Sequence, residues 1–327
     1  MNRQYHALSN QIQAAQTPSP TVAPTPSPEN EKSVNTVTID YGDPLDTNVP
    51  VYDPRLHYFD YTSALIDYEQ NANGRKDENG VKLIYLFDEW IYHPVHIAQY
   101  GLIQYGNYIE TNDEYYLKDA IAQADYLVSQ INNSEAKGKL FYSIDNYTVP
   151  GTDYVLTAPW SSAMAQGQAI SLLSRIYDWT GDKAYLRACQ AAMKPLTVDV
   201  EDGGLRHEFM GHAFYEEYPT EQPTYVLNGF MFTLFGLYDC WQITGDQQAE
   251  KLYQEGIETL KLILPYYDSN GVSLYHLAHT NGTGLAPYYN TQYHKTHVRQ
   301  LATLNQWEKS DLFTFYINRW TAYVNGQ

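Results

Sequence analysis

The stretch ISLLSRIYDWTGDKAYLRACQAAM, at Ile170–Met193, carries the clearest structural signal in the sequence. Apolar residues recur at α-helical spacing on both sides of a central Thr-Gly-Asp turn. They are Ile170, Leu173, Ile176 and Tyr177 before the turn, and Tyr185, Leu186, Cys189 and Met193 after it. Gly181 can adopt the left-handed conformation that ends one helix, and the Asp182 side chain can cap the next. The stretch therefore predicts two helices joined by a tight turn.

Similar turns recur roughly 65 residues apart, which indicates an internal repeat. The sequence reads Thr-Asn-Asp at Thr111–Asp113 and Thr-Gly-Asp at Thr244–Asp246, and both turns follow helical patterns. A fourth unit consists of His297–Trp307, a turn at Ser310, and Leu312–Val324. About four helical hairpins whose inner helices meet predict a mainly α fold, an incomplete (α/α) barrel or toroid. The loops that enter the inner helices should then line one end of this barrel.

Composition divides the chain into three parts. Residues 1–35 contain the run TPSPTVAPTPSPENE, whose Pro, Ser and Thr content indicates a disordered linker. Residues 36–90 form an N-terminal extension, in which VKLIYLF at Val81–Phe87 predicts a strand of a small β element. Residues 91–327 form the α/α-barrel catalytic domain. Because linkers of this kind often tether exported domains, we expect an exported or extracytoplasmic protein.

The overall composition narrows the classes of function. Hydrophobic residues make up 43% of the 327, enough for a sizeable core, and no apolar run reaches the length of a membrane span. A formal net charge of −18 argues against nucleic acid and anionic membrane surfaces as partners. The 32 tyrosines offer apolar faces and hydroxyls that suit sugar rings. Cys189 and Cys240 can be two buried thiols or one disulfide, and a homodimer is possible. No Cys/His cluster predicts a metal site.

A second informative stretch, YEEYPTEQPTYVLNGFMF at Tyr215–Phe232, leads into the third inner helix. Two carboxylates and two phenols stand together directly before Pro219. A residue that precedes proline is disfavoured in helical conformation, so Tyr218 should lie on an extended turn. An acid and a phenol on a rigid loop at the start of a helix are well placed for catalysis.

This stretch resembles the C-terminal catalytic domain of the glucuronyl C5-epimerases, and so do three other motifs. They are HIAQYGL at His96–Leu102, SAMAQGQAIS at Ser162–Ser171 and YHKTHVRQL at Tyr293–Leu301. Four motifs in family order over Tyr92–Trp320 are more specific than one short pattern. The resemblance implies an α/α barrel that converts glucuronate to iduronate within heparosan or heparan-type polysaccharides, with no cofactor and no metal. The β-rich N-terminal domain of the family's animal members has no counterpart of similar size before Tyr92.

Inversion at C5 requires the removal of a weakly acidic proton next to a carboxylate and the return of a proton to the opposite face. By resemblance, the catalytic residues are Glu217, Tyr218, Tyr275 and Tyr293. We expect Glu217 and Tyr293 to act on opposite faces of the sugar ring. Tyr218 and Tyr275 should then orient the substrate carboxylate or relay protons to it. Since tyrosine normally has a pKa near 10, a phenolate base would need cations or hydrogen-bond donors beside it.

The substrate should bind where the motifs meet, at the N-termini of the inner helices, because free N–H groups there suit carboxylates. Candidate substrate-binding residues are His93, His96, Gln99, Asn228, His279, His294, His297 and Arg299. Because YHKTHVRQ opens a helix, His294 and His297 can share a face. Together with Lys295 and Arg299, they should provide the positive patch that a polyanionic substrate needs on an acidic protein.

Two departures from the family pattern concern the substrate more than the reaction. Family members commonly read YDLRH where this chain has Tyr275–His279, so Ala278 replaces an arginine expected to hold a substrate anion. His93–His96 replaces a Tyr-Pro-x-Gln pattern. We expect histidines to bind the anion instead, and binding to weaken as the pH rises through the histidine range. Two alternatives stay open: a polysaccharide lyase, which also begins by removing the C5 proton, and a non-catalytic glycan-binding domain.

Overall fold

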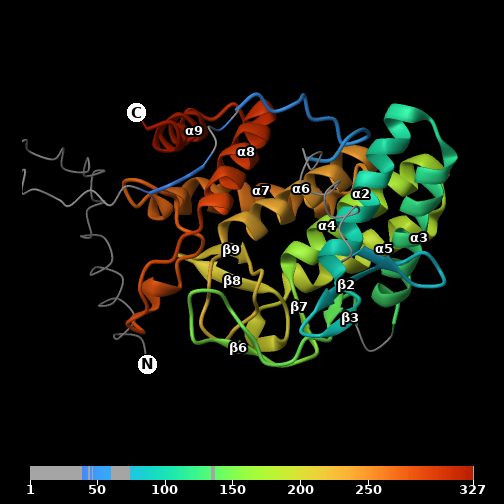
Figure 1. The fold of residues 1–327 in the computed structure, drawn as a ribbon, viewed down its shortest axis with the longest axis horizontal. Helices are drawn as coiled ribbons and strands as arrows, with labels where there is room; N and C mark the ends of the chain where they lie inside the picture. The colour runs from blue at the N-terminus through green and yellow to red at the C-terminus, as the bar shows by residue number, and fades with distance from the viewer. Residues whose placement is uncertain (1–38, 43–44, 46, 60–73, 134–136, 327) are drawn as a thin grey trace, which may run out of the picture. The chain divides into compact units, whose positions relative to one another are not determined.

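The computed structural model describes residues 39–42, 45, 47–59, 74–133 and 137–326. The linker expected over residues 1–35 lies outside them. Within the described residues, eight α-helices form four successive hairpins, so the prediction of a mainly α fold is confirmed (Figure 1). They are α2 (Pro94–Thr111) with α3 (Glu114–Ile131), α4 (Ala163–Thr180) with α5 (Lys183–Met193), α6 (Leu227–Thr244) with α7 (Gln247–Ile263), and α8 (Thr291–Glu308) with α9 (Asp311–Val324).

The turns inside the first three hairpins are those that the repeated pattern predicts. Gly181 follows α4 in the left-handed conformation, with φ of 68°, and the Asp182 side chain accepts a hydrogen bond from the first turn of α5. Gly245 and Asp246 do the same between α6 and α7. Asn112 takes the left-handed position after α2, which asparagine tolerates better than most residues. These local signals place the helix ends correctly.

Helices α2, α4, α6 and α8 form an inner row in which each helix contacts the next. α4 and α6 are buried on almost every side, whereas the outer helices α5 and α7 bury one stripe each. Two glycines allow α4 and α6 to approach closely: a Cβ atom on Gly236 would lie 2.0 Å from the carbonyl oxygen of Gly167. Cys189 and Cys240 are both buried and unbridged. No helix in the described part of the chain has the length and apolar character needed to cross a membrane.

Residues 47–59 connect the two ends of this inner row. The backbone N–H of Tyr52 donates to Gln306 of α8 at 2.8 Å, and a carbonyl of the segment accepts a hydrogen bond from Tyr105 of α2 at 3.2 Å. The Tyr52 hydroxyl also donates to Asp239 at 2.8 Å, and this carboxylate pairs at 2.6 Å with a buried arginine of α4. The segment therefore belongs to the same packed unit as the helices.

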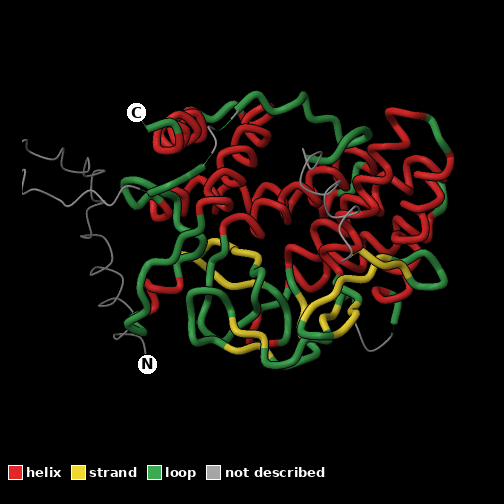
Figure 2. Tube along the Cα trace, in the orientation of Figure 1, coloured by secondary structure: helices red, strands yellow, loops and turns green. Residues whose placement is uncertain are grey.

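The strands are short and antiparallel, and they gather near the end where the inner helices begin (Figures 1 and 2). β2 confirms the strand predicted over Val81–Phe87. The sheets are β1 (Gly74–Lys76), β2 (Lys82–Leu86) and β3 (Glu89–Ile91); β4 (Phe141–Tyr142) with β7 (Trp160–Ser161); β5 (Tyr147–Thr148) with β6 (Val155–Leu156); and β8 (Arg206–Phe209) with β9 (His212–Tyr215).

Candidate active site

The bend between β9 and α6 holds two adjacent carboxylates in different surroundings. Glu216 is fully buried and accepts hydrogen bonds from Thr224 Oγ1 at 2.8 Å and from the Tyr225 N–H at 3.2 Å, and it contacts His207 Nδ1 at 3.1 Å. The Glu216 N–H donates to the carbonyl of Leu205, directly before β8, at 2.8 Å, and the Glu216 carbonyl accepts from the N–H of Ala163, at the start of α4, at 2.9 Å. Glu216 therefore anchors the bend. The carboxyl group of Glu217, next in the chain, lies against Gly229 of α6 and the Tyr275 hydroxyl.

Glu217 has far fewer hydrogen-bond partners than Glu216. Its Oε1 atom lies 3.5 Å from the Tyr275 hydroxyl, and among the described residues its buried Oε2 atom has no hydrogen-bond partner. Burial raises the pKa of Glu217 to about 7, although the Tyr218 and Tyr275 phenols partly oppose the shift. A carboxyl group with a pKa near neutrality can both take and return a proton at physiological pH.

Gly229, in the first turn of α6, makes room for the Glu217 carboxyl group. A Cβ atom at this position would lie 2.1 Å from Glu217 Oε2 and 2.9 Å from Glu217 Cβ. Both contacts are shorter than real Cβ atoms accept, so any other residue would displace the carboxyl group. Glycine at position 229 therefore leaves the space that the Glu217 carboxyl group occupies.

Three phenols surround this carboxyl group. The Tyr218 and Tyr275 hydroxyls are 3.2 Å apart, and both side chains are almost fully buried. Tyr293, at the start of α8, places its ring 4.7 Å from the Tyr275 ring and is 39% exposed. Burial, with a contribution from Glu217, raises the pKa of Tyr293 to about 12, and burial also raises the pKa values of Tyr218 and Tyr275. The phenols are therefore neutral near pH 7, and Glu217 is the group best suited to act as a base. The four expected catalytic residues lie together.

The first inner helix adds a histidine pair at the edge of the site. The His93 and His96 rings lie 4.5 Å apart, and the His93 ring is 4.7 Å from Tyr142. Tyr142 stacks on Trp160 at 4.1 Å, and the Trp160 ring is 6.1 Å from that of Tyr218. Burial lowers the pKa of both histidines, that of His96 to about 4, so they are neutral near pH 7.

Two of the expected substrate-binding polar groups lie on buried helix faces. Gln99 is 9% exposed on α2. Asn228 precedes Gly229, and its carbonyl accepts a hydrogen bond from Gln300 of α8 at 3.0 Å. The Asn228 Oδ1 atom is buried and has no hydrogen-bond partner within the part of the chain that the structure covers. Their roles as substrate ligands stay predictions.

The positive patch expected from His294 and His297 requires a correction. The two rings share a face, as expected, but this face is turned to the protein interior: both Nδ1 atoms lie 2.8 Å from Ser273 Oγ. His294 Nε2 also contacts the Trp320 carbonyl of α9 at 3.0 Å. Both side chains are fully buried and burial lowers their pKa values, that of His294 to about 4. Neutral histidines inside the α8–α9 contact cannot supply the positive charge.

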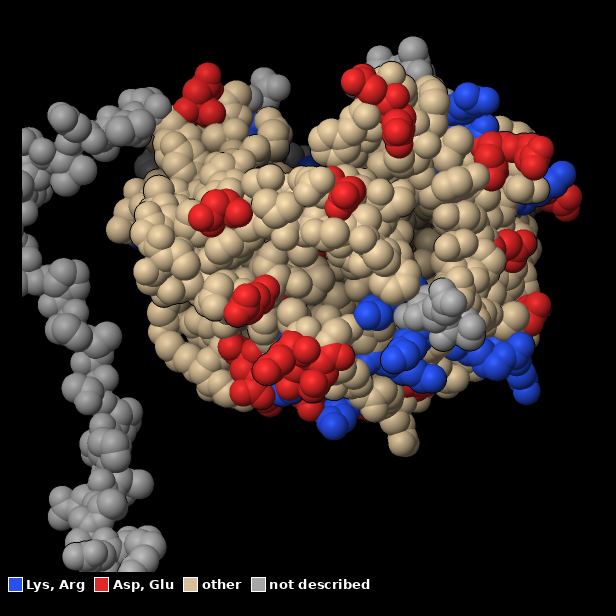
Figure 3. Space-filling view, turned by 90° about the horizontal axis from the view of Figure 1, so that it is seen from below, with Lys and Arg blue, Asp and Glu red and all other residues tan. Residues whose placement is uncertain are grey.

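The remaining candidates lie in the middle of α8 and at the short helix Ala278–Asn281. Arg299 and His279 are both partly exposed. Ala278 has no exposed surface, so an arginine at this position would have to displace packed neighbours. Seen from the side of the strands, Lys and Arg side chains gather mainly in one part of the surface, whereas Asp and Glu side chains are spread over several parts of it (Figure 3). Positive charge is therefore concentrated locally despite the net charge of −18.

The sequence did not single out Tyr147, Tyr142 or Trp160 individually. Tyr147 places its hydroxyl 3.4 Å from that of Tyr218, and its ring packs on Trp160 at 5.3 Å. Its only sequence signal is a tyrosine in a short hairpin, one among 32 tyrosines. In the described residues, no three His, Cys, Asp or Glu side chains are grouped in a way that could hold a metal ion.

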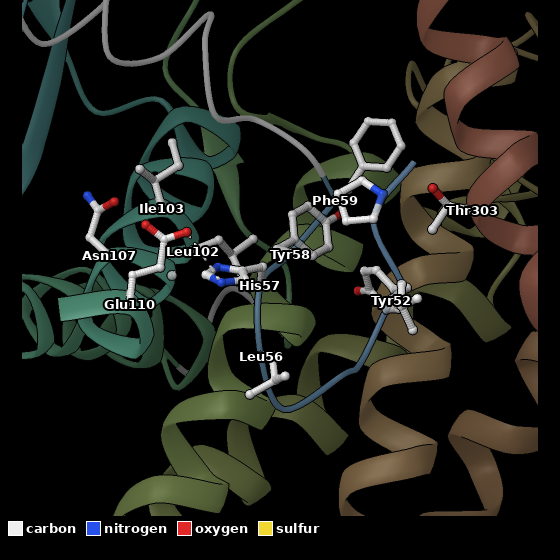
Figure 4. A pocket seen from close by; sticks show the side chains of 13 residues that line it. Tyr52, Leu56, His57, Tyr58, Phe59, Leu102, Ile103, Asn107, Glu110 and Thr303 are labelled. Carbon is white, nitrogen blue, oxygen red and sulfur yellow. Dashed lines mark ion pairs between the residues drawn. The ribbon is translucent and has the colours of Figure 1, made fainter. Parts of the chain in front are cut away.

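A separate cavity of about 610 Å³ lies between α2, α8 and the segment before β1 (Figure 4). His57 and Glu110 face each other in it, with Nε2 and Oε1 3.5 Å apart. Its lining contains none of the residues of the candidate active site, and it borders a part of the chain that the structure does not describe. We therefore assign no role to this cavity.

Comparison with known proteins agrees with the motifs. Residues 132–322 match the family described as D-glucuronyl C5-epimerase C-terminus. The chain is 35% identical to the D-glucuronyl C5-epimerase of Caenorhabditis elegans over 219 residues, which are 63% of this chain and only 35% of that protein. It is 29% identical to an uncharacterized protein of Methanocaldococcus jannaschii over 214 residues, which are 63% of this chain and 67% of that one.

Among solved structures, a glycoside hydrolase family 76 mannosidase from Bacteroides thetaiotaomicron is similar with a TM-score of 0.49 and 15% identity, over 75% of this chain and 63% of that one. A likeness of this size assigns neither a fold nor a function.

Proposed function

Because this chain belongs to the family of D-glucuronyl C5-epimerase C-terminal domains, we propose that it inverts C5 of glucuronate residues within a polysaccharide. The observation that best supports this proposal is the surroundings of Glu217. A buried carboxyl group with a pKa of about 7 lies next to neutral phenols that can donate protons. Such a pair suits a reaction that takes a proton from one face of a carbon atom and returns one to the other.

In the proposed mechanism, ionised Glu217 removes the C5 proton and the substrate forms an enediolate-like intermediate. Tyr293 then donates its phenolic proton to the opposite face and recovers a proton from solvent, to which it is partly exposed. Tyr275 lies between these two groups, since its hydroxyl contacts Glu217 and its ring packs against Tyr293. Tyr275 and Tyr218 can donate hydrogen bonds to the substrate carboxylate, on which negative charge increases in the intermediate.

We propose a heparosan-type polymer as the substrate, in line with the family resemblance. The ring of Tyr293, which is 39% exposed beside the site, suits contact with a sugar ring. The local concentration of Lys and Arg side chains offers a path for a polyanion on a protein of net charge −18. We also propose that the protein is exported, on the basis of the Pro/Ser/Thr-rich run in residues 1–35.

The test is incubation with heparosan-type polymer in deuterated water, followed by analysis of the sugars and of chain length. We expect solvent deuterium at C5 of the uronate, formation of iduronate and no shortening of the chains. An unsaturated, UV-absorbing product with shorter chains would instead identify a lyase. Tight binding with neither deuterium uptake nor cleavage would identify a glycan-binding domain, and either result would overturn the proposal.

A further inference from the structure

A row of hydroxyl groups leads outward from Glu217. The Glu217 Oε1 atom is 3.5 Å from the Tyr275 hydroxyl, which is 3.2 Å from the Tyr218 hydroxyl, which in turn is 3.4 Å from the Tyr147 hydroxyl. Tyr275 and Tyr218 are 1% and 6% exposed, whereas Tyr147 is only half-buried. The row thus begins at a buried carboxyl group and ends at a side chain that reaches the protein surface.

Tyr147 is held in this position by its neighbours. It lies on β5, which pairs with β6, and its ring packs against Tyr218 at 5.7 Å and Trp160 at 5.3 Å. Trp160 is itself fixed, because its indole N–H donates to the Ile144 carbonyl at 2.9 Å. A side chain with this support keeps its hydroxyl in line with the other phenols.

We propose that Tyr147 is the solvent-side end of a proton relay that carries the C5 proton from Glu217 to water. This inference rests on the proposed epimerase function and goes beyond it, since it assigns a role to a residue outside the expected catalytic set. Tyr147 acts through Tyr218 and does not need to touch the substrate, so it is a positioning residue for the proton path.

The proton balance of the relay is simple. After Glu217 has taken the C5 proton, the Tyr275 and Tyr218 hydroxyls turn from the substrate carboxylate to the row. The Glu217 carboxyl O–H then passes a proton to the Tyr275 oxygen, while Tyr275 passes its own to Tyr218. Tyr218 passes its proton to Tyr147, and Tyr147 passes its proton to water. Each phenol again carries one proton, Glu217 is ionised, and one proton has left the site. No oxidant, reductant or further reactant takes part.

A separate path for this proton fits the geometry of inversion. The other proton, which Tyr293 donates, exchanges with solvent directly at the start of α8. With separate paths, the proton that Glu217 removes can exchange with solvent without passing through Tyr293, so exchange on one face can be measured apart from protonation of the other. The distances of 3.2 to 3.5 Å are longer than those of strong O–H···O bonds. Catalytic hydrogen bonds of a ligand-free site commonly shorten when the substrate binds.

The experiment measures how fast Glu217 exchanges its proton with solvent, relative to turnover. A polymer with ordinary hydrogen at C5 is incubated in deuterated water to low conversion. The ratio measured is deuterium at C5 of recovered glucuronate to iduronate formed. An intermediate that returns to glucuronate receives its proton from Glu217, so it carries deuterium only if the relay has already exchanged that proton. We expect a substantial ratio in the parent.

In Tyr147→Phe the relay is cut and the ratio should fall at least about tenfold, because losing a positioned proton-transfer group commonly costs about 10²–10⁴ in the step that it serves. KM and the melting temperature should stay close to those of the parent, since only one oxygen is removed. A general loss of structure would lower both the rate of deuterium uptake into glucuronate and the rate of iduronate formation, and would leave their ratio unchanged. The ratio therefore distinguishes a relay from a structural role.

Tyr154→Phe is the matched control. It removes a hydroxyl from the same hairpin, where Tyr154 accepts a hydrogen bond from Asn281 at 3.4 Å outside the row, and its ratio should equal that of the parent. Tyr218→Phe cuts the row one residue further in and should lower the ratio as Tyr147→Phe does. A parental ratio in either row variant refutes the relay and leaves the epimerase proposal intact. A parent that forms no iduronate refutes both.

Discussion

Replacing Glu217 with glutamine should stabilise the protein while abolishing its activity. In the unfolded chain the carboxyl group has its ordinary pKa of 4.5, whereas burial raises the pKa to about 7 in the folded state. Between these two pH values the folded state binds the proton more tightly, so the free energy of unfolding falls as the pH rises. At about 1.4 kcal/mol per factor of ten in proton affinity, the loss is about 3 kcal/mol once the pH exceeds 7.

Glutamine has almost the same shape and carries no charge at any pH. Glu217→Gln should therefore raise the free energy of unfolding by about 3 kcal/mol at pH 8 and by less than about 1 kcal/mol at pH 5. The assay is urea denaturation at both pH values, with the slope of the transition checked to be unchanged. Epimerisation should be lost at both, because the amide cannot accept the C5 proton.

The neighbouring residue provides a control of opposite sign. Glu216 accepts hydrogen bonds from Thr224 and Tyr225 and contacts His207, and the amide group of Glu216→Gln would leave these three partners only one acceptor oxygen in place of two. We expect this variant to lose about 1–3 kcal/mol of stability. Two results would contradict this reasoning: a Glu217→Gln variant no more stable than the parent at pH 8, or one whose free energy of unfolding rises as much at pH 5 as at pH 8. Either would show that ionising the buried carboxyl group does not destabilise the folded state.

Three further predictions concern the same site. The kcat/KM of epimerisation should rise with pH and level off above about 7, as Glu217 loses its proton; a flat profile from pH 5 to 8 would exclude it as the base. Gly229→Ala should cost about 10²-fold in turnover by displacing the carboxyl group, and about 1–3 kcal/mol of stability through overpacking; unaltered kinetics in the folded variant would contradict the close contact. Tyr293→Phe should fold normally and lose about 10²–10⁴ in turnover, and a near-parental rate would show that another group protonates the second face.

The helices could be predicted because their signals are local. Gly181 and Asp182 act on the backbone within one turn of the chain, and the apolar stripes on either side identify the buried faces. The association of the inner helices follows from the repeat. The bridging role of residues 47–59 could not be foreseen, because it depends on contacts such as that between Tyr52 and Asp239, which lie 187 positions apart.

The site could be predicted where the sequence motifs contain the reactive residues themselves, as with Glu217, Tyr218, Tyr275 and Tyr293. It was not predictable where orientation decides the role. Helical spacing correctly places His294 and His297 on one face of α8, but spacing does not say whether that face meets the substrate or the neighbouring α9. Tyr147 was missed for a related reason: a single phenol in a short hairpin gains its meaning only from the hydroxyl 3.4 Å away.

The buried histidines change the expected pH dependence of substrate binding. Burial lowers the pKa of six histidines in or near the site: His93, His96, His276, His279, His294 and His297. His276 illustrates the consequence, because its Nε2 contacts the Pro150 carbonyl at 2.8 Å while its Nδ1 accepts from the Ala278 N–H at 3.3 Å. A ring held in this way is a neutral imidazole, and protonating it would break the second hydrogen bond. Histidines therefore do not replace the missing arginine as cations, and their titration does not weaken substrate binding as the pH rises through their ordinary range. A transition near pH 7 then belongs to Glu217, whose ionisation both creates the base and adds a negative charge beside the anionic substrate. Binding and turnover measured over the same pH range should change at one shared pH, and a second transition in binding alone would reveal a titrating anion-binding group.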